Sequence, residues 1–181
     1  MRTFIAIDIP EGVKEEIIKI QKEISSFDFN GKLTEKENLH LTLKFIGEID
    51  VGLVEKIKKK LFQVRFSRFE TEIDSIGHFD NARSKFYERK LIVWLHLTNC
   101  NELQKKVDDA LSGLFPVEKR FMSHLTIARI KSVKDKAKFI QAIKNVKISK
   151  IRFTVDEFEL KESVLMEKGP KYKTLERYKL N

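Results

Sequence analysis

Leu39-His-Leu-Thr-Leu-Lys-Phe45 is the stretch that decides the fold, because apolar and polar residues alternate along it. Alternation with a period of two is typical of a β-strand that buries one face. We predict that the apolar face, Leu41, Leu43 and Phe45, packs into a core. The opposite face, with His40, Thr42 and Lys44, is then available for binding or catalysis.

The pattern recurs at Phe121-Met-Ser-His-Leu-Thr-Ile-Ala128. Alternation there buries Leu125 and Ile127 and places His124 beside Thr126. Side chains two residues apart on a strand lie about 7 Å apart, so an imidazole and a hydroxyl can contact one phosphate group. Each tripeptide can therefore supply half of a site.

Working outward, each copy of this strand is the second strand of a β-α-β-α order. The first half is predicted as a strand at 3–9, a helix with Val13, Ile17, Ile20 and Ile24, a polar loop around Asn30 and Gly31, the strand at 39–45, and a helix at 54–61. The second half, beginning near Lys90, is predicted as a strand at 91–97, a helix at 103–114, the strand at 121–128, and a helix at 133–146.

Three further segments complete the prediction. Residues 69–79 indicate a strand and turn between the halves, and residues 172–180 indicate a final strand. A change of apolar parity between Val155 and Phe158 predicts a bulge near Asp156. Parallel sheets, or two antiparallel sheets packed face to face, fit this order equally well.

A pseudo-twofold axis between the halves would bring His40 and His124 together across a groove. Attack at phosphorus needs one group that takes a proton from the nucleophile and another that gives a proton to the leaving oxygen. Histidine, with an ordinary pKa near 6.5, can serve in either state. Thr42 and Thr126 would donate hydrogen bonds to the phosphate oxygens.

The other two histidines are predicted to be structural. His96 also stands in a His-Leu-Thr tripeptide, but on the first strand of its half, where Asn99 and Glu102 fit a helix-capping pair. His78 is predicted to lie in a surface turn. Two isolated structural histidines, or a metal site, are the alternatives for His40 and His124, although neither motif offers a second metal ligand at a useful spacing.

The composition favours some partners and compartments and excludes a disulfide-rich or membrane-spanning protein. The net charge of +9 favours a polyanionic partner such as nucleic acid, although Lys-rich and Glu-rich surfaces also occur in heat-adapted proteins. The single cysteine excludes an internal disulfide and a zinc framework, which suits a reducing cytoplasm. No signal peptide, no apolar run of about 20 residues and no linker is visible, so we expect one soluble unit over residues 1–181.

The chain resembles the 2H phosphoesterases, specifically the archaeal and bacterial RNA 2′,3′-cyclic phosphodiesterases, or 2′-5′ RNA ligases. The resemblance is carried by Arg2-Thr-Phe-Ile-Ala-Ile-Asp8, by 37–48, by Ser123-His-Leu-Thr-Ile-Ala-Arg129, and by 155–160 and 169–172. It implies an α+β fold with two pseudo-twofold lobes, each a mainly antiparallel sheet with outer helices, and an active-site cleft between them.

The resemblance also implies an activity without cofactor or metal. Terminal 2′,3′-cyclic phosphates of RNA, such as those of tRNA fragments, would be hydrolysed to 2′-phosphates, with His124 as proton acceptor and His40 as proton donor. A 5′-hydroxyl in place of water would give ATP-independent 2′-5′ ligation. Hydrolysis of small cyclic nucleotides or of ADP-ribose cyclic phosphate, and non-catalytic binding of RNA ends, are the alternatives.

Arg129 matches an arginine that the resemblance places on the substrate phosphate. By strict alternation it shares the packed face with Leu125 and Ile127, so it reaches the cleft only if the strand ends or bulges near Ala128. A surface salt bridge is the alternative. Because one chain supplies both halves of the site, we expect a monomer.

Overall fold

The computed structural model describes residues 1–80, 91–167 and 169–181, and Lys90 lies outside them. Its helices are α1 (Glu11–Ser25), α2 (Val51–Leu61), α3 (Asn101–Leu111) and α4 (Lys136–Asn145), with a 3₁₀ turn at Lys36–Asn38. Its strands are β1 (Arg2–Asp8), β2 (Phe29–Leu33), β3 (His40–Glu48), β4 (Phe69–Asp80), β5 (Leu91–Leu97), β6 (His124–Val133), β7 (Ile151–Val155), β8 (Glu157–Met166) and β9 (Gly169–Lys179).

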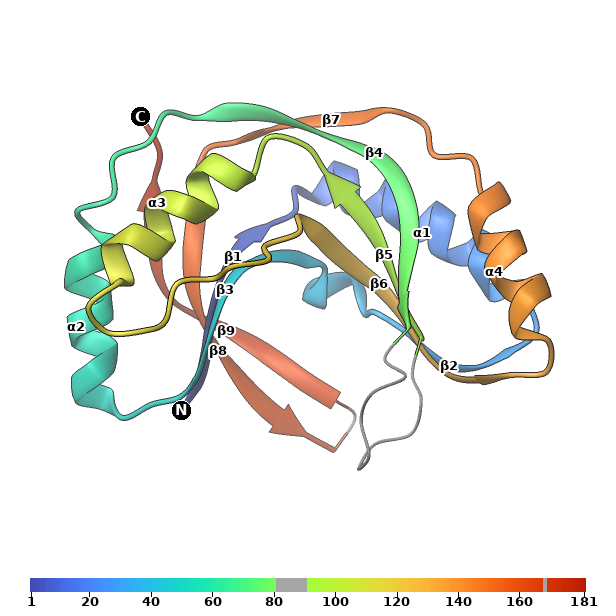
Figure 1. Ribbon diagram of the computed structural model, residues 1–181, viewed down its shortest axis with the longest axis horizontal. Helices are drawn as coiled ribbons and strands as arrows, with labels where there is room; N and C mark the ends of the chain where they lie inside the picture. Colours follow the sequence, from blue (N-terminus) through green and yellow to red (C-terminus); the bar gives the residue numbers. More distant parts are fainter. Residues whose placement is uncertain (81–90, 168) are drawn as a thin grey trace.

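These strands form a sheet in the order β7-β4-β5-β6-β3-β1-β8-β9, and β2 also pairs with β6. Every pairing between the described strands is antiparallel, which settles the choice that periodicity left open. The halves do not pack face to face. They join edge to edge between β3 and β6, where Leu41 is paired with Leu125 (Figure 1).

The helices form where the apolar period predicted them. On α1 the residues Val13, Ile17, Ile20 and Ile24 are buried, because their spacing places them on one side of the helix. Asp50 and Asp135 cap the first turns of α2 and α4 by accepting hydrogen bonds from backbone amides. Helices α2 and α3 lie side by side at one end of the molecule (Figure 1). None of the described helices is long and apolar enough to cross a membrane.

Two matched β-bulges change the faces of the motif strands. Leu43 has no partner in the β1–β3 register, and Ile127 has none in the β5–β6 register. Each extra residue shifts the alternation, so Lys44 and Ala128 are buried and the residues that follow them are exposed. The predictions that Phe45 packs and that Lys44 shares the histidine face are therefore wrong.

Gly31 shows why the predicted loop around Asn30 is instead the strand β2. A Cβ at residue 31 would lie 2.5 Å from the carbonyl oxygen of Arg129, so only glycine allows β2 to approach β6 this closely. The polar composition suggested a loop, but β2 is a short strand with largely exposed residues.

Three smaller predictions also differ from the structure. His78 lies within β4 and not in a turn. Asn99 adopts a positive φ of 62° and its amide donates to the Glu70 carbonyl, so it does not cap α3. The parity change at Asp156 is not a bulge inside one strand, because the chain passes there from β7, which pairs with β4, to β8, which pairs with β1.

Candidate functional site

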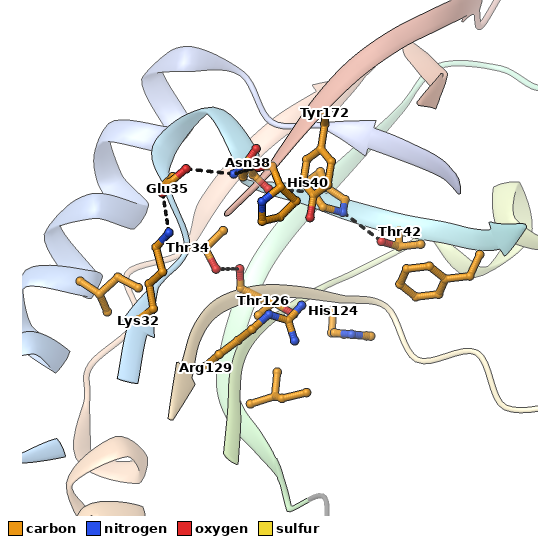
Figure 2. A pocket seen from close by; sticks show the side chains of 14 residues that line it. Lys32, Thr34, Glu35, Asn38, His40, Thr42, His124, Thr126, Arg129 and Tyr172 are labelled. Atoms are coloured by element: carbon orange, nitrogen blue, oxygen red, sulfur yellow. Dashed lines mark hydrogen bonds and ion pairs between the residues drawn. The ribbon is translucent and has the colours of Figure 1, made fainter. Parts of the chain in front are cut away.

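A pocket of about 280 Å³ opens where β3 and β6 meet (Figure 2). Strand β3 contributes His40, Thr42 and Phe45, and strand β6 contributes His124, Thr126 and Arg129. The rest of the wall is formed by Lys32, Leu33, Thr34, Glu35, Asn38, Ile92, Pro170 and Tyr172. All five residues that the sequence singled out for a phosphate site therefore line one pocket.

Both imidazoles are held by the same backbone contact. His40 Nδ1 lies 2.7 Å from the carbonyl oxygen of Asn38, and His124 Nδ1 lies 2.7 Å from that of Met122. A carbonyl can only accept, so each Nδ1 carries a hydrogen and each neutral ring keeps its lone pair on Nε2. In the His40 half, this Nε2 lies 3.1 Å from the hydroxyl of Thr42, which can donate to it.

An aromatic ring meets each imidazole edge-on at the same distance. Tyr172 packs on His40 and Phe79 packs on His124, both at 5.0 Å between centroids and 84° between planes. His40 has a second aromatic neighbour, Phe4, at 5.0 Å. Burial is the main reason that the pKa of His40 falls to about 4, so His40 is neutral at neutral pH in the free protein.

The bulges place different side chains at equivalent positions of the two halves. Each bulge turns the fifth residue after the histidine toward the pocket, and this residue is Phe45 on β3 and Arg129 on β6. Phe45 is 74% exposed. Because β3 and β6 are antiparallel, Phe45 and Arg129 lie toward opposite ends of the pocket. From the sequence, we expected Arg129 to reach the cleft only if the strand ended or bulged near Ala128. The structure has this bulge, at Ile127.

Buried polar side chains hold the two bulged segments. In β6, the amide of Gln21 on α1 donates to the carbonyls of Ile127 and Thr34, at 2.9 and 2.8 Å. In β3, Lys44 forms a buried ion pair with Asp108 on α3 and donates to the Pro116 carbonyl at 2.7 Å. Hydrogen bonds to buried groups fix the backbone there, so the bulges are held by tertiary contacts.

Asn38 ties the β8–β9 hairpin to the motif strand. Its side-chain amide donates to the Pro170 carbonyl at 3.0 Å and to the Glu35 carboxylate at 3.2 Å, and Glu35 is paired with Lys32 at 2.6 Å (Figure 2). This contact holds the start of β9 over the pocket. Tyr172, two residues beyond Pro170, is thereby placed against His40.

Sequence reasoning missed most of the pocket wall. Phe45 was assigned to the core because the apolar alternation of Leu41 and Leu43 continues at residue 45 without a change of parity that would indicate the bulge. Tyr172 stands in the closing segment on which the resemblance rests, which was the available signal. Thr34 and Ile92 come from distant strands and carry no signal. His96 and His78 are not among the residues that line the pocket.

No group of three or more His, Cys, Asp or Glu side chains in the described ranges is placed to hold a metal ion. The polar side chains that line the pocket carry imidazoles, hydroxyls, an amide and a guanidinium, together with the paired ammonium of Lys32 and carboxylate of Glu35. This set suits an anion that carries several oxygen atoms.

The chain is similar to known phosphoesterases in both sequence and structure. The family model described as LigT like phosphoesterase matches residues 7–86 and 97–172. An RNA 2′,3′-cyclic phosphodiesterase of Methanocaldococcus jannaschii is 37% identical, with 98% of this chain and 100% of the relative covered, and one of Thermotoga maritima is 33% identical over 97% and 93%. The structure of Escherichia coli LigT complexed with 3′-AMP aligns with a TM-score of 0.77 at 25% identity, over 99% and 97% of the chains. The chain belongs to the LigT-like phosphoesterase family.

Proposed function

We propose that this protein hydrolyses the terminal 2′,3′-cyclic phosphate of RNA to a 2′-phosphate. The observation that carries the proposal is the pair of imidazoles at twofold-equivalent positions of one pocket, each with Nδ1 bonded to a carbonyl and Nε2 left for chemistry. The related proteins named RNA 2′,3′-cyclic phosphodiesterase support the choice of substrate.

In the proposed reaction, His124 Nε2 takes a proton from water as the water oxygen bonds to phosphorus. The bond from phosphorus to O3′ breaks, and His40 gives a proton to O3′. Thr42 and Thr126 donate to non-bridging oxygens, and Arg129 pairs with the phosphate charge. A 5′-hydroxyl in place of water would give a 2′-5′ linkage by the same steps.

The state of His40 determines the order of events. Since burial lowers its pKa to about 4, His40 is neutral in the free enzyme at neutral pH and carries no proton on Nε2. An anionic phosphodiester bound beside the ring favours the charged imidazolium. His40 therefore gains its proton as the substrate binds, and the acid is formed only in the complex.

Phe45 supports a nucleotide substrate. An exposed aromatic ring at the end of a phosphate pocket can stack on a base of any identity. The pocket volume is near the lower end for small-molecule sites, so it suits one terminal nucleotide. A cyclic mononucleotide or ADP-ribose cyclic phosphate would fit the same pocket, which makes hydrolysis of these molecules the second candidate.

The test uses RNA that ends in a labelled 2′,3′-cyclic phosphate, with EDTA present. Wild-type protein should release the 2′-phosphate, His40→Ala and His124→Ala should not, and the control His78→Ala should be active. Turnover that vanishes with chelator, or persists in either of the first two variants, contradicts the mechanism. Binding without turnover in the wild type indicates a protein that only holds RNA ends. Rates on an oligonucleotide and on a cyclic mononucleotide separate the two candidate substrates.

A further inference from the structure

The third His-Leu-Thr tripeptide has a neighbour that the sequence did not predict. In the β5–β6 register His96 is directly opposite His124. Directly opposed residues of an antiparallel pair point to the same face, with Cβ atoms about 5 Å apart. The side chains of His96 and His124 therefore leave the same face of the sheet at neighbouring positions, although His96 is not among the residues that line the pocket.

His96 is held in place by a carboxylate. Its Nδ1 lies 2.7 Å from Asp74 Oδ1, and the hydroxyl of Ser75 donates to the same oxygen at 3.0 Å. Asp74 stands at a shift in the β4–β5 register, where a bulge can aim a side chain. Although burial opposes ionisation, the hydrogen bonds from His96 and Ser75 lower the pKa of Asp74, so its negative charge is permanent at neutral pH.

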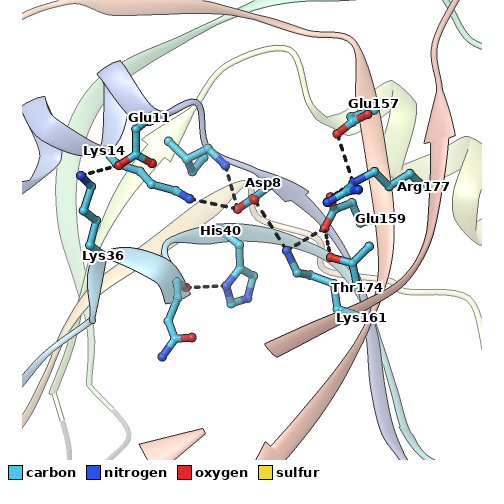
Figure 3. Close-up of polar contacts among 12 residues, drawn as sticks. Asp8, Glu11, Lys14, Lys36, His40, Glu157, Glu159, Lys161, Thr174 and Arg177 are labelled. Carbon is cyan, nitrogen blue, oxygen red and sulfur yellow. Dashed lines mark hydrogen bonds and ion pairs between the residues drawn. The ribbon is translucent and has the colours of Figure 1, made fainter. Parts of the chain in front are cut away.

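The equivalent position in the other half carries the opposite electrostatic arrangement. Asp8 is directly opposite His40 in the β1–β3 register. Two lysines, Lys14 at 3.6 Å and Lys161 at 3.8 Å, contact its carboxylate, and both are more than 90% buried (Figure 3). The carboxylate opposite His40 is thus matched by two ammonium groups, whereas the residue opposite His124 is an imidazole that is bonded to a carboxylate.

Other charged groups of the described residues also lie on these strands or line the pocket. Glu72, on the same strand as Asp74, is paired with Arg152 at 2.5 Å and with Lys150 at 3.8 Å. On the pocket side, the charged or titratable groups that line the same pocket as His124 are Arg129, the neutral His40, Lys32, Glu35 and Tyr172. Within the described ranges, Asp74 is the carboxylate bonded to the imidazole that lies opposite His124.

We propose that His96 and Asp74 form a positioning pair for His124, in which the charge of Asp74, bonded to His96, stabilises the positive charge that His124 acquires when it accepts a proton. The negative charge of Asp74 therefore favours His124 over His40 as the residue that accepts the proton. The positioning pair rests on the proposed function, because it acts on the catalytic step of His124.

The direct test is a titration of the histidine ring protons by NMR. The chain has four histidines, so each resonance can be assigned by a single His→Gln substitution. In Asp74→Asn the titration midpoint of His124 should move down by about half a pH unit, and the shift should shrink in high salt, because both members of the pair are about one-third exposed. An unchanged midpoint in both Asp74→Asn and His96→Gln overturns the proposal.

Kinetics on a 2′,3′-cyclic mononucleotide give a second readout. Asp74→Asn and His96→Gln should lower kcat about two- to fivefold with little change in KM, and the double variant should be no worse than the single ones. The matched control is His78→Gln on β4, which by alternation faces away from the pocket and should leave kcat unchanged. A purely structural role would change thermal stability without moving the pH profile, and this result would also contradict the proposal.

The proposed function and the His96–Asp74 positioning pair can be disproved independently. If His124→Ala keeps full activity, the proposed function is wrong, whatever the NMR midpoints show. If His124→Ala is inactive while Asp74→Asn and His96→Gln behave as wild type in both measurements, the proposed function stands and the positioning pair does not.

Discussion

The half of the pocket around His40 and the half around His124 share a backbone and differ in their side chains. In both, Nδ1 is bonded to the carbonyl two residues earlier, an aromatic edge meets the imidazole at 84°, and a bulge follows the threonine. Beyond this frame, the position that holds Phe45 on β3 holds Arg129 on β6, and the buried lysines around Asp8 contrast with the His96–Asp74 pair. The repeated backbone sets the geometry, and residues outside the motifs make the two histidines chemically different.

The largest effect should come from removing either imidazole. His40→Ala and His124→Ala are each expected to lower kcat on a cyclic phosphate by about 10²–10⁴, because each removes a proton-transfer group. A phosphodiester with a p-nitrophenolate leaving group, which needs no protonation, should separate the halves. It should restore much of the rate in His40→Ala and little in His124→Ala, and the reverse pattern would exchange the two roles.

The supports of the two bulges should differ in strength. Lys44→Met leaves the buried carboxylate of Asp108 without its ion-pair partner, which is expected to cost about 3–5 kcal/mol in the free energy of unfolding. Gln21→Leu, in the other half, removes two hydrogen bonds from buried carbonyls and is expected to cost about 1–3 kcal/mol. Denaturant unfolding measures both values. Lys44→Met/Asp108→Leu should recover part of the loss, and equal costs for the two single variants would contradict the comparison.

The burial of His40 should appear in the dependence of stability on pH. Its pKa falls from an ordinary 6.5 to about 4 in the folded protein, so between these values the unfolded chain binds the proton more readily. Wild-type stability should therefore decrease as the pH falls from 6.5 to 4, by about 3 kcal/mol from this group. His40→Gln should lack that component in urea unfolding at pH 7, 5.5 and 4. Parallel curves for the two proteins would show that His40 is not buried as described.

The smallest effects should distinguish the two ends of the pocket. Arg129→Ala is expected to raise KM roughly tenfold on every cyclic phosphate, since Arg129 is exposed and a charge-assisted contact to phosphate then contributes about 1.5 kcal/mol, the lower end of the usual range. Phe45→Ala should raise KM by a similar or smaller factor only for substrates that carry a base, because it removes stacking. Ribose 2,3-cyclic phosphate, which lacks a base, is the control. A loss on this substrate in Phe45→Ala would mean that the ring shapes the phosphate site instead.

The sequence by itself determined the helices, the two catalytic candidates and the strands other than β2, whose polar composition indicated a loop. Period-two alternation locates β3 and β6, and the order of elements shows that His40 and His124 occupy equivalent strands. These features are local, because alternation depends only on neighbours along the chain. The α+β class was implied by the resemblance to the 2H phosphoesterases, which rests on these motifs and on the two ends of the chain, and the comparisons support both the class and the family.

Only the tertiary structure decided which side chains complete the pocket. The bulges at Leu43 and Ile127 turn Phe45 and Arg129 into it and bury Lys44, and they depend on Gln21, Asp108 and the registers with β1 and β5. The place of His96 opposite His124, and of Tyr172 against His40, likewise depends on which strands pair. Contacts between residues far apart in the chain set register and burial, and no local pattern encodes them.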